Sequence, residues 1–140
     1  MKTAIITGAS GGIGKALVLK LAGMGMNLVL VGRSDEKLRE VCSQAEKRQL
    51  AFSAPDRQGS AKTETMHPES VTGTGRPGTL ICCGDLTRTE FAEEIIRAVG
   101  ERFGGLDVLI NCAGIAQHDP FEKVTPEQFD RIMATNVRAP

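Results

Sequence analysis

The sequence predicts an α/β fold, in which a parallel sheet is covered by helices on both faces. Three observations lead to this prediction. Four short apolar runs, at residues 3–7, 28–31, 79–83 and 107–111, have the length and composition of buried strands. Segments with helical spacing of apolar residues alternate with these runs. A glycine-rich turn, TGASGGIG at residues 7–14, joins the first run to the first of these segments.

The composition predicts one globular domain spanning residues 1–140. Hydrophobic residues form 41% of the chain, and 17 basic residues balance 17 acidic ones. The charge therefore gives no reason to expect binding to nucleic acid or to a membrane surface. No apolar run reaches the roughly eighteen residues that a membrane span requires. The first residues lack a cationic leader with a cleavage site, so we expect a cytoplasmic protein.

The cysteines and histidines do not form a metal-binding pattern. The four cysteines, at 42, 82, 83 and 112, lack the paired spacing of a metal site. Cys82 and Cys83 are adjacent in a predicted strand, so their side chains should point to opposite faces. His67 and His118 lie far apart in polar segments. We therefore expect buried free thiols, solvent-facing histidines and no bound metal.

The glycine-rich turn predicts a binding site for a pyrophosphate. Glycine at positions 8, 12 and 14 allows a sharp turn, close approach of backbone amides to phosphate, and close packing of the next helix on the sheet. That helix points its positive end at the turn. Its predicted apolar stripe consists of Ala16, Leu17, Leu21 and Met24. The candidate cofactor-binding residues of the turn are Gly8, Ser10, Gly11, Gly12, Ile13 and Gly14.

The main alternative for this turn is the P-loop of nucleotide hydrolases, because Gly14 and Lys15 resemble its Gly-Lys pair. A P-loop needs a glycine at position 9 and a hydroxyl at position 16. Those positions hold Ala9 and Ala16. The sequence therefore favours a dinucleotide site, with Lys15 as a solvated helix residue.

The turn resembles the cofactor turn of the short-chain dehydrogenase/reductase family. Further along, Asn111, Cys112, Ala113 and Gly114 are similar to the family's Asn-Asn-Ala-Gly motif, with cysteine at the second place. The resemblance covers nearly the whole chain except residues 51–77. It implies a Rossmann-like, doubly wound sheet with strand order 3-2-1-4. It also implies an oxidoreductase that interconverts a small-molecule alcohol and carbonyl with a nicotinamide cofactor.

The end of the second strand predicts which nicotinamide is bound. An acidic side chain at this place would bind the ribose of NAD, but positions 32 and 33 hold glycine and arginine. Arg33, followed by Ser34, can form bidentate bonds to the 2′-phosphate of NADP. We therefore expect NADP rather than NAD. The alternative is that Arg33 only flanks a helix capped by Ser34, and that Asp35 reaches a ribose.

The third strand leads into a turn that contains Asp85 and Leu86. Spacing alone indicates ordinary turn residues before a helix, whereas the resemblance places both in the adenine pocket. The helix should begin with a capping box of Thr87 and Glu90 and end at two glycines, 104 and 105. Its predicted apolar stripe consists of Phe91, Ile95, Ala98, Val99 and Phe103.

The fourth strand ends at small residues that leave room for a cofactor, so Asn111, Ala113 and Gly114 are further candidate binding residues. Cys112 is either a small buried side chain or a reactive thiol.

A last helix should begin at Thr125, which the sequence marks as an N-cap, and bury an apolar face that contains Asn136. From the residues alone, Asn136 is either a satisfied core amide or a positioned functional group. The resemblance implies the family's catalytic asparagine, whose backbone helps hold a water in a proton relay. The predicted apolar face consists of Phe129, Ile132, Met133 and Val137.

Two features depart from the family pattern. Residues 51–77 are rich in Ser, Thr, Gly and Pro and predict a flexible inserted loop at the sheet edge opposite the cofactor, or else an altered gene segment. The chain also contains no tyrosine, whereas the family protonates its substrate with a tyrosine beside a lysine, both expected after Pro140. We therefore expect this chain to bind NADP weakly at most, without turnover.

Two other functions stay open at this stage: a non-catalytic dinucleotide-binding module, and a degenerate truncated product. The strand at residues 107–111 would present an unpaired apolar edge, which predicts marginal stability or aggregation. In a complete protein, the resemblance implies a homo-oligomer with subunit contacts near the helix that carries Asn136.

Overall fold

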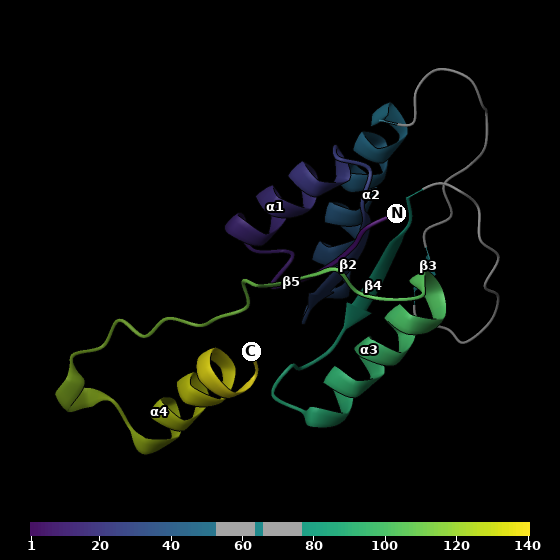
Figure 1. Ribbon diagram of the computed structural model, residues 1–140. Coiled ribbons are helices and arrows are strands. Elements are labelled where there is room, and N and C mark those ends of the chain that lie inside the picture. Colours follow the sequence, from purple (N-terminus) through teal and green to yellow (C-terminus); the bar gives the residue numbers. More distant parts are fainter. Residues whose placement is uncertain (53–63, 66–76) are drawn as a thin grey trace.

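The structure, a computed structural model, describes residues 1–52, 64–65 and 77–140 (Figure 1). Within these ranges five strands form one parallel sheet in the order β3-β4-β2-β1-β5. The strands are β1 (Thr3–Thr7), β2 (Asn27–Gly32), β3 (Glu64–Thr65), β4 (Thr79–Cys83) and β5 (Val108–Asn111). The order β4-β2-β1-β5 confirms the predicted 3-2-1-4.

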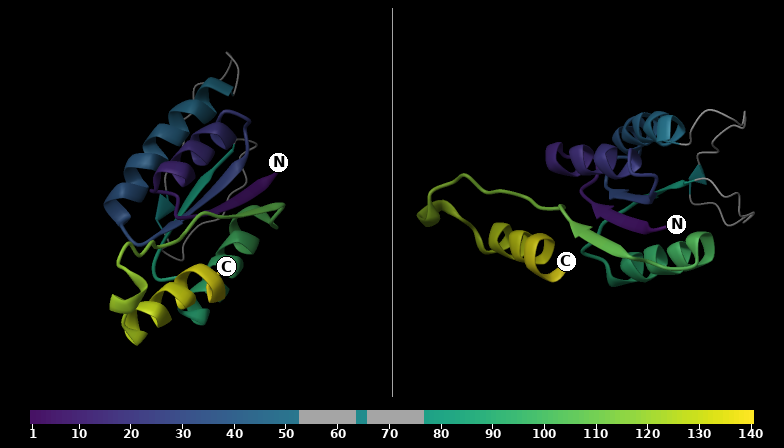
Figure 2. Two further views of the ribbon diagram at one scale, coloured as in Figure 1. Left: turned by 90° about the vertical axis from the view of Figure 1, so that its left-hand side faces the viewer. Right: turned by 45° about the horizontal axis from the view of Figure 1, so that its top comes forward.

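Helices cover both faces of the sheet, as predicted. Helices α1 (Gly12–Ala22) and α2 (Asp35–Phe52) lie on one face, and α3 (Thr89–Phe103) lies on the other (Figure 2). Because successive strand residues point to opposite faces, β1, β2 and β4 each supply side chains to both cores. Ile6, Leu28 and Leu30 face α1 and α2, whereas Val29 and Val31 face α3.

The buried face of α1 differs from the predicted stripe. Gly14, Val18 and Ala22 are its buried residues, whereas Ala16 and Met24 are exposed. The rotation of the helix is set by its first turn, where a Cβ on Gly14 would lie 2.2 Å from a carbonyl oxygen of the glycine-rich turn. Backbone packing, rather than the largest apolar side chains, therefore decides which face of α1 is buried.

Helix α2 begins as predicted but ends later. The Lys37 N–H donates to Ser34 Oγ at 3.5 Å, which confirms Ser34 as the N-cap. The helix continues to Phe52, two residues into the predicted loop of 51–77, and Glu64 and Thr65 in that loop form the edge strand β3. Residues 53–63 and 66–76 of the predicted loop lie outside the described residues, as does His67.

Buried hydrogen bonds fix the chain on both sides of this segment. Gln49, near the end of α2, donates to the Met26 carbonyl at 2.8 Å and accepts from the Thr79 hydroxyl at 3.3 Å. The Gly78 N–H donates to Asn27 Oδ1 at 3.0 Å. Side chains of α2 and β2 therefore fix the end of α2 and the residues that lead into β4.

The start of α3 overturns the predicted capping box. The helix begins at Thr89, and its N-cap residue Arg88 makes no side-chain capping bond. Thr87 therefore lies one residue before the N-cap, out of register for the predicted box, and its hydroxyl donates to Asp85 (below). The predicted apolar stripe and helix end are confirmed: Phe91, Ile95 and Val99 are buried, with Ala98 and Phe103 packed against them, and Gly104 is left-handed with a φ of 78°.

The segment after β5 extends beyond the carboxyl ends of the strands (Figures 1 and 2). It contains the short helix η1 (Phe121–Lys123), α4 (Pro126–Met133) and the π-helical turn η2 (Ala134–Arg138). The cap of α4 is confirmed, since the Gln128 N–H donates to Thr125 Oγ1 at 3.3 Å and Gln128 Oε1 accepts from the Thr125 N–H at 2.8 Å. The predicted burial of its apolar face is wrong for this chain.

Phe129 and Val137 are 54% and 63% exposed, and no residue of α4 or η2 is buried by the described residues. Strand β5 is likewise an edge strand in the described sheet, with Leu109 half exposed. No helix in the described ranges is both long enough and apolar enough to cross a membrane.

Candidate functional site

The glycine-rich turn lies directly against the end of β5. Gly8 has a φ of 63°, in the left-handed region, and a Cβ there would lie 2.8 Å from the Ala113 α carbon and nitrogen. Only glycine combines this conformation with this close approach. The first glycine is therefore explained by the fold, because it lets the end of β1 touch the end of β5.

The other glycines of the turn separate into two kinds. Gly14 must be glycine for helix packing, because its Cβ would overlap the Gly8 carbonyl oxygen. Gly12 has no such constraint, since a Cβ there would meet nothing within 4 Å and the residue is exposed. The Gly11 N–H donates to the Gly8 carbonyl at 2.9 Å. The amino terminus of α1 is open at Gly12.

This helix end suits an anion. Gly11 is the N-cap of α1 and offers no side chain that would bond to the first N–H groups, and the first turn contains no acidic residue. The free N–H groups and the helix dipole therefore favour a negatively charged ligand. Ser10 and Ile13 flank the opening, and Ile13 is 74% exposed.

Thr7 links the end of β1 to the residues after β5, a role that the sequence did not predict. Its Oγ1 accepts hydrogen bonds from the backbone N–H groups of Cys112 and Ala113, both at 3.1 Å. A hydroxyl at the last residue of a buried strand is the only local signal of this role. The bonds hold Asn111 to Gly114 beside the glycine-rich turn, as the prediction for these candidate residues requires.

A second group of candidates lies at the ends of β2 and β4. Gly32 and Cys83 are paired in register, and the Gly84 N–H donates to the Gly32 carbonyl at 2.9 Å. The turn with Asp85 therefore runs beside Arg33, and both side chains are exposed. Leu86 is half-buried against the α3 core, so it presents only part of its side chain to this edge.

Asp85 is held in its ionised form. Its Oδ1 accepts from the Thr87 N–H at 2.9 Å and from the Thr87 hydroxyl at 2.8 Å. These bonds lower the pKa of the Asp85 carboxyl, with a smaller contribution from the charges of Arg33 and Arg88. Asp85 is thus an exposed hydrogen-bond acceptor at the edge of the sheet.

Asn136 makes a reciprocal pair of hydrogen bonds with the backbone of Ile115. Its Oδ1 accepts from the Ile115 N–H at 2.9 Å, and its Nδ2 donates to the Ile115 carbonyl at 2.8 Å. Gly114 lies next to the Asn136 side chain, because a Cβ on Gly114 would lie 3.4 Å from Asn136 Oδ1. The side chain is a satisfied amide, and it connects η2 to the segment after β5.

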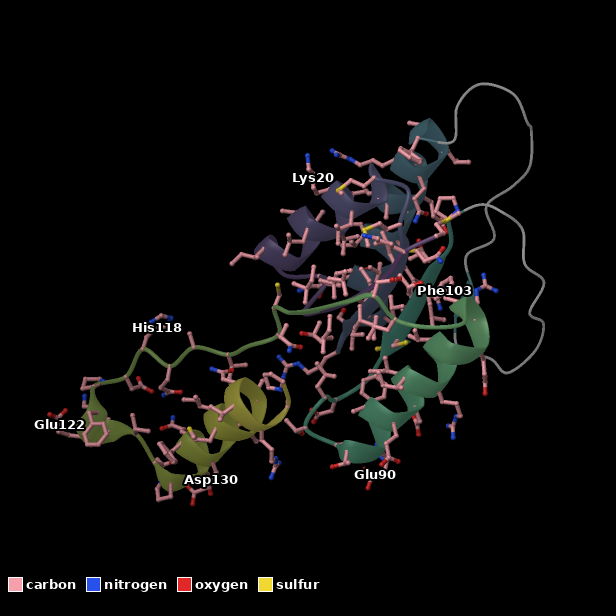
Figure 3. The ribbon with its side chains drawn as sticks, in the orientation of Figure 1. Lys20, Glu90, Phe103, His118, Glu122 and Asp130 are labelled. Carbon is pink, nitrogen blue, oxygen red and sulfur yellow. The ribbon has the colours of Figure 1, made fainter. Side chains whose placement is uncertain are left out.

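The described residues hold no group of three or more His, Cys, Asp or Glu side chains that could bind a metal ion. The four cysteines are free thiols, but their predicted burial is confirmed only for Cys42 and Cys82, because Cys112 is half-buried and Cys83 lies at the exposed end of β4. Cys82 is buried, which raises its pKa to about 12, whereas Cys83 is exposed. His118 is exposed on the segment between β5 and η1, as predicted (Figure 3).

The candidate residues therefore lie together at the carboxyl end of the parallel sheet. The ends of β1, β2, β4 and β5 bring together the glycine-rich turn, Arg33, Asp85 and the residues after β5, at the position where the strand order reverses between β1 and β5. In open parallel sheets this crevice is where nucleotides bind. Fold and site together define a protein of the doubly wound, dinucleotide-binding class.

Comparisons with known proteins agree with this class. The family model described as short chain dehydrogenase matches residues 2–81 and 58–140, in two overlapping segments. The D-beta-hydroxybutyrate dehydrogenase of Rhizobium meliloti (strain 1021) is 33% identical over 136 residues, which are 97% of this chain and 43% of that protein. The chain belongs to the short-chain dehydrogenase family.

Solved structures give the same result. A dehydrogenase/reductase from Sinorhizobium meliloti 1021 superposes with a TM-score of 0.75 and 31% identity, over 99% of this chain and 45% of that one. The alcohol dehydrogenase of the archaeon Thermococcus sibiricus, solved with 5-hydroxy-NADP, has a TM-score of 0.75 and 28% identity, over 99% of this chain and 48% of that one. The chain thus spans less than half the length of each of these relatives.

Proposed function

We propose that this chain binds NADP at the carboxyl edge of its sheet and is the cofactor-binding part of a short-chain oxidoreductase. The whole protein would interconvert an alcohol and a carbonyl of a small molecule, with the nicotinamide supplying or accepting the hydride. The observation that carries the proposal is the open space above Gly12 at the uncapped amino terminus of α1. The proposed binding residues are Gly8, Ser10, Gly11, Gly12, Ile13, Gly14, Arg33, Ser34, Asp85, Leu86, Asn111, Ala113 and Gly114.

The site fits the chemistry of a dinucleotide. Free N–H groups at the start of α1 suit the pyrophosphate, and a side chain at Gly12 would occupy the space above them. Among the described residues, nothing lies close enough to require glycine at this position. A glycine that the fold does not need, placed beside free amide donors, supports a ligand whose phosphates approach the backbone.

Two observations favour NADP over NAD. Arg33 is exposed at the end of β2, where it can meet a 2′-phosphate. The carboxylate that could serve a ribose instead, Asp35, accepts a hydrogen bond from Arg39 Nε at 2.6 Å on the surface of α2. The description of the Thermococcus sibiricus relative as a complex with 5-hydroxy-NADP supports the same choice.

The chain by itself lacks the group that would protonate the substrate. Reduction of a carbonyl needs a proton donor for the developing alkoxide, and the 140 residues contain no tyrosine. Asn136 is the one residue of catalytic type, and its side chain bonds to Ile115. We therefore expect the isolated chain to bind cofactor without turnover, which is also how a non-catalytic binding module would behave.

Titration of NADPH into the purified chain tests the proposal. The chain contains no tryptophan or tyrosine, so the fluorescence of bound NADPH can be read without protein background. Gly12→Asp should abolish binding while leaving the circular dichroism and melting temperature unchanged, because its side chain enters open space. Gly105→Asp is the matched control, because a Cβ on Gly105 also meets nothing within 4 Å and Gly105 follows α3, at the end of the sheet opposite to the candidate site.

The two parts of the proposal fail separately. No saturable NADPH signal from the unsubstituted chain would refute cofactor binding. NADPH oxidation above a blank with a panel of ketones and aldehydes, lost in Gly12→Asp, would refute the expected lack of turnover and establish the chain as an enzyme.

A further inference from the structure

A network of buried polar side chains lies at the amino end of the sheet, opposite to the candidate site. Its members are Thr3, Asn27, Gln49 and Thr79, which are between 1% and 8% exposed. The Asn27 amide donates to the Thr3 hydroxyl at 3.3 Å, and Gln49 bonds to Met26 and Thr79 as described above. Among the described residues, no buried side-chain nitrogen or oxygen lacks a partner. Because an unpaired buried amide is costly, a complete network of this kind favours one arrangement of the chain.

Two members of this network hold the start of β4. The Thr79 hydroxyl donates to Gln49 Oε1 on α2, and the Gly78 N–H donates to Asn27 Oδ1 on β2. The residue before, Pro77, has no N–H. A strand shifted by one residue toward its carboxyl end would therefore leave both acceptors without these donors. The two bonds are satisfied together in only one register of β4.

The apolar pattern of β4 does not set this register by itself. Leu80 and Cys82 pack in the α3 core, and Ile81 packs in the core beneath α1 and α2. Because the strand is apolar on both faces, a shift by one residue would exchange one apolar side chain for another. A short connection could also set the register, but residues 53–78 separate α2 from β4 in the sequence. The bonds at the start of β4 therefore supply information that its core residues lack.

The register of β4 decides the position of the turn that follows it. The Gly84 N–H donates to the Gly32 carbonyl at 2.9 Å, which places the turn beside the end of β2. Gly84 also packs on the Phe91 ring, where a Cβ would lie 2.5 Å from two ring atoms. A shift by one residue would bring a side chain to this point and move the turn by about 3.3 Å along the strand. The turn would then lie at a different position relative to Arg33.

We propose that Gln49 and Asn27 are positioning residues for the candidate site: by holding the start of β4, they fix the register in which its other end places the following turn beside β2. The register is a property of the fold, whereas its consequence for the cofactor rests on the proposed function. Neither side chain contacts the candidate site, because both lie at the amino end of the sheet and act through the strand.

The two adjacent cysteines of β4 report its register. Cys82 is buried and Cys83 is exposed. If β4 shifts by one residue toward its carboxyl end, Cys82 takes the exposed place of Cys83. Labelling with an uncharged maleimide, with the modified cysteine identified by mass spectrometry, therefore detects the shifted strand. Hydrogen exchange at the amides of residues 80–82 distinguishes a shift from local unfolding, because the ladder forms again in a shifted strand and is lost in an unfolded one.

Substitutions at both bonds test the proposal. Thr79→Val removes the hydroxyl that bonds to Gln49, and a shifted strand then no longer buries a hydroxyl in the α3 core. Asn27→Ala removes the acceptor for the Gly78 N–H. Each single variant should raise the labelling rate of Cys82, and the double variant should raise it about tenfold or more, with amide protection at residues 80–82 unchanged. The apparent dissociation constant of NADPH should rise by the factor that the shifted fraction implies.

Two further variants serve as controls. Thr79→Ser keeps the hydroxyl and should behave as the unsubstituted chain does. Thr3→Val makes the same chemical change as Thr79→Val, at another buried threonine of the network that does not bond to β4. It should lower the melting temperature without changing the labelling of Cys82 or the affinity for NADPH. If Thr79→Val does not fold, Gln49→Met removes the same bond from the side of α2.

The possible outcomes separate the role of the network from the proposed function. If the double variant labels Cys82 no faster than Thr3→Val does, Gln49 and Asn27 do not fix the register. If labelling of Cys82 and amide exchange at residues 80–82 rise together, the network only stabilises β4 and positions nothing. If the unsubstituted chain does not bind NADPH, the proposed function fails and the role in the cofactor site fails with it, whereas the labelling still decides whether the network fixes the register.

Discussion

Gly8 and Ala113, which are 105 positions apart in the sequence, touch backbone to backbone in the folded chain. A Cβ on Gly8 would lie 2.8 Å from the Ala113 α carbon. The bonds from Cys112 and Ala113 to Thr7 Oγ1 hold the same two strand ends together. The floor of the candidate site is therefore a contact between the beginning of the chain and a motif near its end, and it forms only when β1 and β5 are paired.

This contact predicts that Gly8→Ala destabilises the fold. The added methyl group meets backbone that cannot move aside, and the positive φ is strained for any residue but glycine. Together these effects should lower the free energy of unfolding by about 2–4 kcal/mol. Urea denaturation followed by circular dichroism measures the loss. Gly12→Ala, where the methyl group meets nothing, should change stability by less than about 1 kcal/mol; equal losses at both positions would show that the contact is not important.

Arg33 predicts the cofactor preference. Arg33→Ser should remove the charge-assisted bonds to the 2′-phosphate and raise the dissociation constant of NADPH about ten- to a hundredfold. The dissociation constant of NADH should change little, because NADH lacks that phosphate. Parallel fluorescence titrations with the two cofactors measure the change in preference. Arg48→Ser, which removes an exposed arginine further along α2, is the comparison variant. If the unsubstituted chain already prefers NADH, the end of β2 binds the ribose of NAD and not the 2′-phosphate of NADP.

From its alternating strands and helices, which can be connected in few ways, the sequence predicted a parallel sheet, with the strand order that the family resemblance implies. It predicted the rotation of α1 less well, since that rotation depends on a backbone overlap at Gly14 rather than on side-chain hydrophobicity. The hydrogen bonds of Thr7 could not be predicted, because their donors lie more than a hundred residues away. Local patterns specify elements, and long-range contacts then decide how each element is turned.

The capping boxes predicted at Thr125 and Thr87 had different outcomes. At Thr125 the capping box forms as expected, because Gln128 stands at the right spacing and no other partner intervenes. At Thr87 the predicted box does not form, because α3 begins at Thr89 with Arg88 as its N-cap, so Thr87 and Glu90 are one residue out of register with the helix start. The apolar pattern of α4 is also present as predicted, but a pattern shows only that a face is apolar and not which surface covers it.

The cysteines should differ in reactivity. Burial raises the pKa of the Cys82 thiol to about 12, so at pH 8 only about one molecule in ten thousand carries its reactive thiolate. Cys83, the next residue, is exposed. We expect an aromatic disulfide reagent to label the folded chain at Cys83 and to reach Cys82 only after unfolding. With the half-buried Cys112 replaced by serine in every variant, Cys83→Ser should remove the fast reaction and Cys82→Ser should not; fast labelling that survives Cys83→Ser and is lost in Cys82→Ser would contradict the buried position of β4.

The Asn136 side chain should act as a structural connection in this chain. Both of its polar groups bond to Ile115, so Asn136→Ala should speed hydrogen exchange of the Ile115 amide about tenfold. Because these groups are exposed and water can replace the side chain, global stability should fall by no more than about 1 kcal/mol. The affinity for NADPH should stay within about twofold, since the site described above does not use this side chain.

Asn136→Asp separates the two bonds. It keeps an oxygen that can accept from the Ile115 N–H and loses the donor to the Ile115 carbonyl, so the Ile115 amide should stay protected while η2 becomes less firmly attached. Exchange at the backbone amides of residues 134–138 measures that second effect. Unchanged exchange at Ile115 in Asn136→Ala would mean that the connection does not form. Loss of NADPH affinity in both variants would instead place Asn136 in the cofactor site, where its role would go beyond holding the backbone after β5.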